Sequence, residues 1–162
     1  MRKQLTIYVL AATLLLGIGG AGPTLAATGD PVLINEVLAS HAGTDDTEYI
    51  EFFGTPGTSL DGLSLIVVES SNISTVGQFD ERIDFGPGDV LGSNGFYLVG
   101  NATGLQANYS VTPNIDIDPN LENDNLTVAL VETSSIIGGS VSGSEVVRDA
   151  VQRHTALLGQ FL

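Results

Sequence analysis

The chain has 162 residues, no cysteine and a formal net charge of −14, from 19 acidic and 5 basic side chains. This length is enough for one domain with a real hydrophobic core. The missing cysteine excludes disulfides, thiolate metal sites and cysteine nucleophiles. The acidity argues against direct nucleic-acid binding, which depends on Lys and Arg contacts with phosphates.

Residues 1–26 have the layout of a secretory signal peptide. Arg2 and Lys3 precede an apolar run over 5–18, and small residues follow that suit cleavage after Ala26. The run is shorter than the roughly 20 apolar residues that span a bilayer. We therefore expect export to a secreted or periplasmic location, with no permanent membrane span after cleavage.

The rest of the chain reads as strands and turns. Short runs rich in Val, Ile, Leu, Phe and Tyr alternate with clusters of Gly, Asp, Asn and Ser, and no 3.6-residue periodicity is sustained. Seven or eight short strands with frequent turns indicate an all-β, immunoglobulin-like β-sandwich. The runs predict strands at 32–38, 47–53, 62–69, 81–85, 96–100, 126–132 and 145–151, with another near 107–112.

Alternation within the runs predicts which side chains face the core. In the 62–69 run the shared apolar face consists of Leu63, Leu65 and Val67. In the 126–132 run it consists of Leu126, Val128 and Leu130. In the 47–53 run, Ile50 and Phe52 are expected to point inward and Glu51 toward water. Glu48 is expected at the end of that strand, near the rim of the sandwich.

Five segments in order resemble the lamin tail domain, the immunoglobulin-like module of nuclear lamins and of many exported bacterial proteins. The resemblance covers roughly 31–151 and is closest to bacterial secreted forms. Gly54 departs from it, because the family usually has Asn there, and 152–162 matches no expected last strand and stays unassigned, as in a truncated product. The similar segments are Ile34-Asn35-Glu36, EYIEFF (48–53), LDGLSL (60–65), GDVLGSNGFYLVG (88–100), and NLENDNLTVALVE (120–132) followed by VVRDAV (146–151).

This resemblance implies a non-enzymatic binding or targeting module. The expected partner is a protein or cell-surface ligand of unknown identity. The alternative is an N-terminal accessory domain of a truncated extracellular nuclease or phosphoesterase, since such modules often precede these enzymes in bacteria.

Glu36, Glu48 and Glu51 are the first candidates for chemistry, because paired carboxylates can act as general acid and base. The same neighbourhood offers no nucleophile with its base, no oxyanion cradle and no histidine cluster. We therefore expect these acids to cap strand ends, to accept hydrogen bonds from loop backbone, or to stay solvated. No catalytic, cofactor or metal residues are predicted.

The acidic stretch 114–125 is the best candidate for a cation. Its Asp116, Asp118 and Asn120 have the spacing of the first three calcium ligands of an EF-hand, and Glu122 and Asp124 follow. The EF-hand match fails because Leu121 replaces the turn glycine and Thr127 replaces the bidentate Glu. A weak, irregular calcium site therefore stands as the alternative to a solvated turn.

Two histidines and three aromatic residues complete the candidates. His41 and His154 lie far apart without a shared motif, so we expect ordinary surface residues rather than metal ligands. Tyr49, Phe53 and Tyr97 are the candidate anchors for a partner, provided that they face outward.

Overall fold

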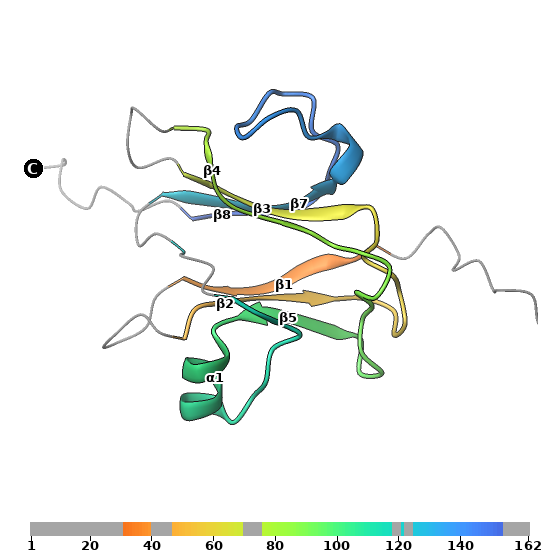
Figure 1. Ribbon diagram of the computed structural model, residues 1–162, viewed down its shortest axis with the longest axis vertical. Helices are drawn as coiled ribbons and strands as arrows, with labels where there is room; N and C mark the ends of the chain where they lie inside the picture. The colour runs from red at the N-terminus through yellow and green to blue at the C-terminus, as the bar shows by residue number, and fades with distance from the viewer. Residues whose placement is uncertain (1–30, 40–46, 70–75, 118–120, 122–124, 154–162) are drawn as a thin grey trace, which may run out of the picture.

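The computed structural model describes residues 31–39, 47–69, 76–117, 121 and 125–153 (Figure 1). The expected signal peptide lies outside these residues. In chain order the described elements are β1 (Leu33–Leu38), β2 (Tyr49–Phe53), β3 (Leu63–Glu69), β4 (Phe79–Asp84), β5 (Phe96–Gly100), α1 (Ala102–Tyr109), β6 (Ile115–Asp116), β7 (Leu126–Glu132), the 3-10 turn η1 (Thr133–Ser135) and β8 (Val147–Arg153).

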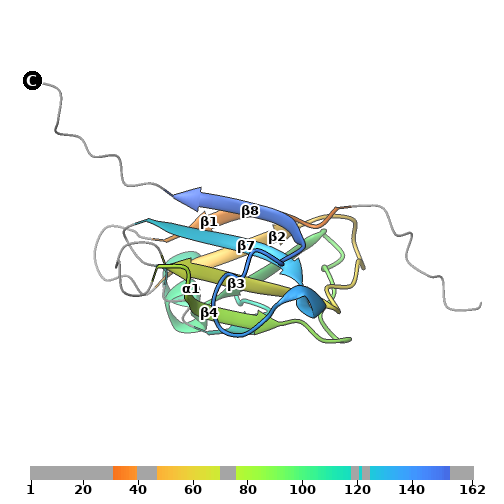
Figure 2. The same ribbon diagram turned by 90° about the horizontal axis from the view of Figure 1, so that it is seen from above.

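The eight strands of the described residues form two four-stranded sheets, in the orders β1-β2-β5-β6 and β4-β3-β7-β8. All pairings are antiparallel except that of β5 with β6, which is parallel. Figure 1 shows the two sheets as facing layers, and in Figure 2 the strands of both layers run along roughly the same line. This is an aligned sandwich, so the predicted all-β sandwich of seven to eight strands is confirmed.

The main core fills the space between the two sheets. Ile50 and Phe52 of β2 have no exposed surface, as the alternation predicted, and the inward residues of β3 and β7 meet them from the other sheet. The ring of Phe85 lies edge-on to Phe52, with centroids 5.7 Å apart, and edge-on to Tyr97 at 5.8 Å. Edge-to-face aromatic contacts of this kind add to the burial energy.

A second, smaller cluster lies on the outer side of β3 and β7. Ile66, Val68, Ala129 and Val131 are buried there, with Phe79 and Ile136 packed against them. Figure 1 shows the connection from β7 to β8, residues 133–146, lying over this side of the sheet. Because β3 and β7 are covered on both faces, their sequences LSLIVVE and LTVALVE read as nearly continuous apolar runs.

The predicted strand near 107–112 is wrong, because this region contains the helix α1. The Asn101 side chain accepts a hydrogen bond from the Gly104 N–H at 3.0 Å and begins the helix. Ser110, with φ of 57°, ends it in the left-handed conformation. Only Gly104 and Leu105 of the helix are buried, so its sequence carries no apolar stripe of helical period.

Candidate binding face

The outward side of β1, β2 and β5 carries three rows of side chains set by the strand register. Each row crosses the three strands, because residues that pair across neighbouring strands point to the same side of a sheet. The rows are Leu33, Phe53 and Phe96; then Glu36, Glu51 and Leu98; then Leu38, Tyr49 and Gly100. We call this surface the β1–β2–β5 face.

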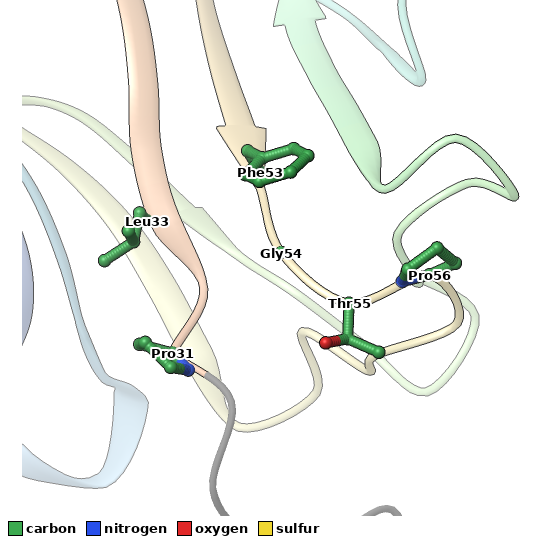
Figure 3. A pocket seen from close by; sticks show the side chains of 6 residues that line it. All are labelled: Pro31, Leu33, Phe53, Gly54, Thr55 and Pro56. Atoms are coloured by element: carbon green, nitrogen blue, oxygen red, sulfur yellow. The ribbon is translucent and has the colours of Figure 1, made fainter.

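The first row is apolar and open to solvent. Leu33 is 42% exposed and Phe53 is 43% exposed. The rings of Phe53 and Phe96 lie side by side with centroids 4.9 Å apart. A hollow of about 370 Å³ adjoins them, lined by Pro31, Leu33, Phe53, Gly54, Thr55 and Pro56 (Figure 3).

Gly54, the departure from the lamin-tail pattern, has a packing reason. A Cβ at this position would lie 2.9 Å from Leu91 Cδ1 and 3.3 Å from the carbonyl oxygen of Pro31. Both distances are shorter than ordinary contacts, so a side chain here would displace the Leu91 side chain and press on the backbone of Pro31. The close approach holds the Phe53 end of the hollow against the chain before β1.

The second row places two carboxylates opposite each other. Glu36 of β1 and Glu51 of β2 are register partners, and like charges directly opposite on a sheet repel. A bulge between Ile34 and Glu36 leaves both Asn35 and Glu36 exposed. From there the Asn35 side-chain amide donates a hydrogen bond to Glu51 Oε1 at 2.6 Å.

Tyr49 joins this acidic row from the third row. Its hydroxyl group donates a hydrogen bond to the Glu36 carboxylate. Burial, first, and then this bond and the negative charges of Glu36 and Glu51 raise the pKa of Tyr49 well above its ordinary value. The tyrosine therefore stays a neutral donor next to the two carboxylates.

The structure divides the three candidate glutamates between the two sides of the sheet. Glu36 and Glu51 lie on the outward side, whereas Glu48 is 4% exposed and accepts the backbone N–H of Leu121 at 2.7 Å. Of the three alternatives expected for these carboxylates, Glu48 follows the second, in which the carboxylate accepts a hydrogen bond from loop backbone. The adjacent Thr47 hydroxyl is also buried, without a hydrogen-bond partner.

The acidic stretch 114–125 is only partly described. Asp116 accepts the backbone N–H of Ala102 at 2.9 Å, next to the start of α1, and Leu121 is buried in the main core. Asp118, Asn120, Glu122 and Asp124 lie outside the described residues, as do His41 and His154. Across the described ranges, no three His, Asp or Glu side chains converge in a way that could hold a metal ion.

Two of the three proposed aromatic anchors face outward. Phe53 and Tyr49 lie on the β1–β2–β5 face, but Tyr97 is 3% exposed and points into the core. Its hydroxyl donates to Asp89 Oδ1 at 2.5 Å, so Tyr97 as an anchor is wrong. Leu33 and Phe96 were missed, because their place beside Phe53 depends on the pairing of distant strands.

No helix in the described part of the chain is long and apolar enough to cross a membrane.

No protein-family model matches this chain, and no curated protein matches it. The chemistry of the β1–β2–β5 face is therefore the main guide to function.

Proposed function

We propose that this chain is an exported, non-enzymatic β-sandwich of the lamin-tail kind that acts by binding, and that the β1–β2–β5 face is its binding surface. The export part of the proposal is supported by the N-terminal pattern of Arg2, Lys3 and the apolar run over 5–18. The lamin-tail part is supported by the five similar segments and by the two-layer sandwich.

The observation that carries the binding role is the group of exposed apolar side chains that lies beside an open hollow on the β1–β2–β5 face. The chain covers the apolar outer side of β3 and β7 with its own residues, including Ile136. On the other sheet it leaves Leu33 and Phe53 more than 40% exposed beside an open hollow. A group of exposed apolar side chains rimmed by polar residues is typical of an interaction site.

The non-enzymatic part is supported by how the carboxylates are used. Glu48 lies on the inner side of β2, bonded to the Leu121 backbone, and is separated by the sheet from Glu51. Glu36 and Glu51 accept hydrogen bonds from Tyr49 and Asn35. The three acids thus hold the structure together or shape its surface.

The test is to follow backbone amide signals of the purified protein by NMR while adding three kinds of probe. These are short peptides, neutral oligosaccharides and anionic lipid vesicles. We expect a binding probe to shift amides of β1, β2 and β5, and Phe53→Ser to abolish those shifts. Val147→Ser, which changes an exposed valine on the other sheet, is the matched control.

Two results would contradict the proposal. One is binding that shifts only the amides of β4, β3, β7 and β8. The other is turnover of phosphodiester, ester or glycoside substrates by the purified protein. Export is tested separately, by expressing the full chain in a bacterium and sequencing the N-terminus of the exported product; retention of residues 1–26 on a cytoplasmic product would contradict it.

A further inference from the structure

The chemistry of the β1–β2–β5 face also indicates the kind of partner, an inference that rests on the proposed binding role. The described side chains bring no positive charge to the acidic row. Asn35 and Tyr49, the donors to Glu51 and Glu36, are neutral. The arginines with described side chains both lie on the other sheet, where Arg82 pairs with Asp84 and Arg148 with Glu132.

A cation placed between Glu36 and Glu51 would turn a repulsive pair into a favourable site. Like charges at directly opposite positions of an antiparallel pair destabilise it, with Cβ atoms about 4.5–5.5 Å apart. A guanidinium or ammonium group carries several N–H donors and can contact both carboxylates at once. The formal net charge of −14 also draws cationic partners toward the molecule and repels anionic ones.

The apolar row fixes the second feature of the partner. Phe53 and Glu51 are two residues apart on one side of β2, which corresponds to about 6.8 Å along the strand. Side chains i and i+2 of an extended peptide have the same separation and also point to one side. A single peptide can therefore place an apolar side chain at the hollow beside Phe53 and a basic one at the acidic row.

The helix α1 limits how far such a peptide can extend. Leu105 lies against Gly100, at the end of the third row. A Cβ added at Gly100 would be only 2.9 Å from Leu105 Cδ1 and 2.9 Å from Tyr49 Cβ. The open part of the face therefore consists of the first two rows, with Tyr49 at its border. This open part has room for two ligand side chains, one at each row.

We propose that the β1–β2–β5 face binds an extended polypeptide segment with the pattern apolar–any–Lys/Arg, the apolar side chain entering the hollow beside Leu33 and Phe53 and the basic group bridging Glu36 and Glu51. An isolated metal ion would leave the hollow empty. A neutral polysaccharide would leave the paired carboxylates without a counter-charge.

The probe is a fluorescein-labelled peptide of sequence Thr-Leu-Thr-Arg-Thr, added to the purified protein and followed by anisotropy and by backbone amide shifts. We expect binding that weakens as salt rises from about 0.02 to 0.5 M, because the pair is solvent-accessible. Glu51→Gln and Glu36→Gln should each weaken binding about threefold or more. Phe53→Ser should weaken it further.

Controls separate charge, spacing and folding. Glu81→Gln makes the same charge change on β4 of the other sheet and should leave the affinity unchanged. A peptide with Leu and Arg adjacent should bind more weakly, and one with Glu in place of Arg should not bind. Melting temperatures of all variants should match that of the parent protein within a few degrees.

Unchanged affinity in Glu51→Gln, or equal binding of the adjacent-residue peptide, would overturn this inference. Binding of a neutral oligosaccharide or of anionic vesicles to the same face, without peptide binding, would also overturn it and leave the proposed binding role intact. If every probe that binds shifts only the other sheet, the binding role of this face fails as well.

Discussion

The carboxylate of Asp149 accepts the backbone N–H of Ile34 at 2.7 Å, although 115 residues separate the two in sequence. Ile34 lies in β1, an edge strand of one sheet, and Asp149 lies in β8, an edge strand of the other. The bond thus joins the two layers along one side of the sandwich. It also occupies a backbone donor on an edge strand, where unpaired donors invite pairing with other chains.

Asp149→Ala is expected to destabilise the protein by about 1–3 kcal/mol, because the Ile34 N–H loses its acceptor in a partly buried place. Asp149→Asn keeps a side-chain oxygen and should cost less than half as much. Urea unfolding followed by circular dichroism measures both. Equal losses in the two variants would show that the acceptor oxygen is not what matters.

Glu48 is expected to be among the least replaceable acids of the described chain. Its bond to the Leu121 N–H is buried, so Glu48→Ala removes the acceptor and leaves space beside the core. We expect a loss of about 2–4 kcal/mol for Glu48→Ala and a smaller loss for Glu48→Gln, which keeps an oxygen. The comparison variant is Glu51→Gln on the outward side, which should change the unfolding free energy by less than about 1 kcal/mol.

Gly100 is required by close packing. A Cβ there would lie 2.8 Å from the backbone oxygen of Glu48 and 2.9 Å from both Leu105 Cδ1 and Tyr49 Cβ. Gly100→Ala should therefore cost about 1–3 kcal/mol and shift the amide signals of α1. Gly139→Ala is the matched control, because no atom lies within 4 Å of its added Cβ; a similar loss in both variants would contradict the packing argument.

The ionisation of Tyr97 is expected to make the protein less stable at high pH. Burial and then the hydrogen bond to Asp89 raise the pKa of Tyr97 well above its ordinary value of 10.0. The folded chain thus holds the Tyr97 hydroxyl proton at a pH where the unfolded chain loses it. The contribution of this tyrosine to the free energy of unfolding is therefore constant below about pH 10 and falls as the pH rises further. Tyr97→Phe should lower the stability at neutral pH by about 1 kcal/mol and flatten this alkaline fall.

Urea midpoints measured from neutral pH to about pH 11.5 test the Tyr97 prediction, since tyrosine ionises near pH 10. Tyr109→Phe, at a tyrosine that is 52% exposed, is the control. An alkaline fall that is steeper in Tyr97→Phe than in Tyr109→Phe would contradict the assignment.

The turn at Ser142 and Gly143 is expected to loosen in acid, when Glu145 becomes protonated. Its carboxylate accepts the Ser142 N–H at 2.9 Å, the Ser142 hydroxyl at 2.8 Å and the Gly143 N–H at 2.9 Å. Backbone donors, with that of Ser142 first, lower the pKa of Glu145 from 4.5 to about 2. The turn is therefore held by charge above about pH 4.5 and released as the pH falls through about 2.

The amide shift of Gly143 as a function of pH measures this release by NMR. We expect a midpoint near pH 2, and Glu145→Gln should remove the titration. A midpoint near 4.5 would show that the carboxylate is not held by these donors.

Local patterns were enough to predict seven of the eight strands of the described residues, but not the two-residue strand β6 or the helix. Ile50 and Phe52 were placed correctly because alternation within one strand fixes which side chains point inward. The helix α1 has eight residues and buries only Gly104 and Leu105, so no periodic signal marks it. Its start was readable in principle from Asn101 as an N-cap, but Gly104 in the first turn is a poor helix former.

The candidate site could be predicted only in part, because it depends on long-range pairing. The sequence places Glu51 and Phe53 on one side of β2, but it does not show that Leu33 and Phe96 lie beside Phe53. Likewise, alternation gives the direction of Glu48, whereas its bond to Leu121 spans 73 residues. Contacts of this kind follow from the order of strands in the sheets, which a single sequence does not encode locally.

The double covering of β3 and β7 sets a hierarchy of hydrogen exchange within the domain. Their amides are enclosed by the main core on one side and by the Ile66 cluster on the other, so their protons exchange only when the whole domain opens. The strands β1 and β2 have one face open to solvent, so their amide protons are expected to exchange through smaller, more frequent openings. A ligand at the proposed β1–β2–β5 face would therefore contact the layer that opens more often, while the slowly exchanging layer behind it keeps the domain folded.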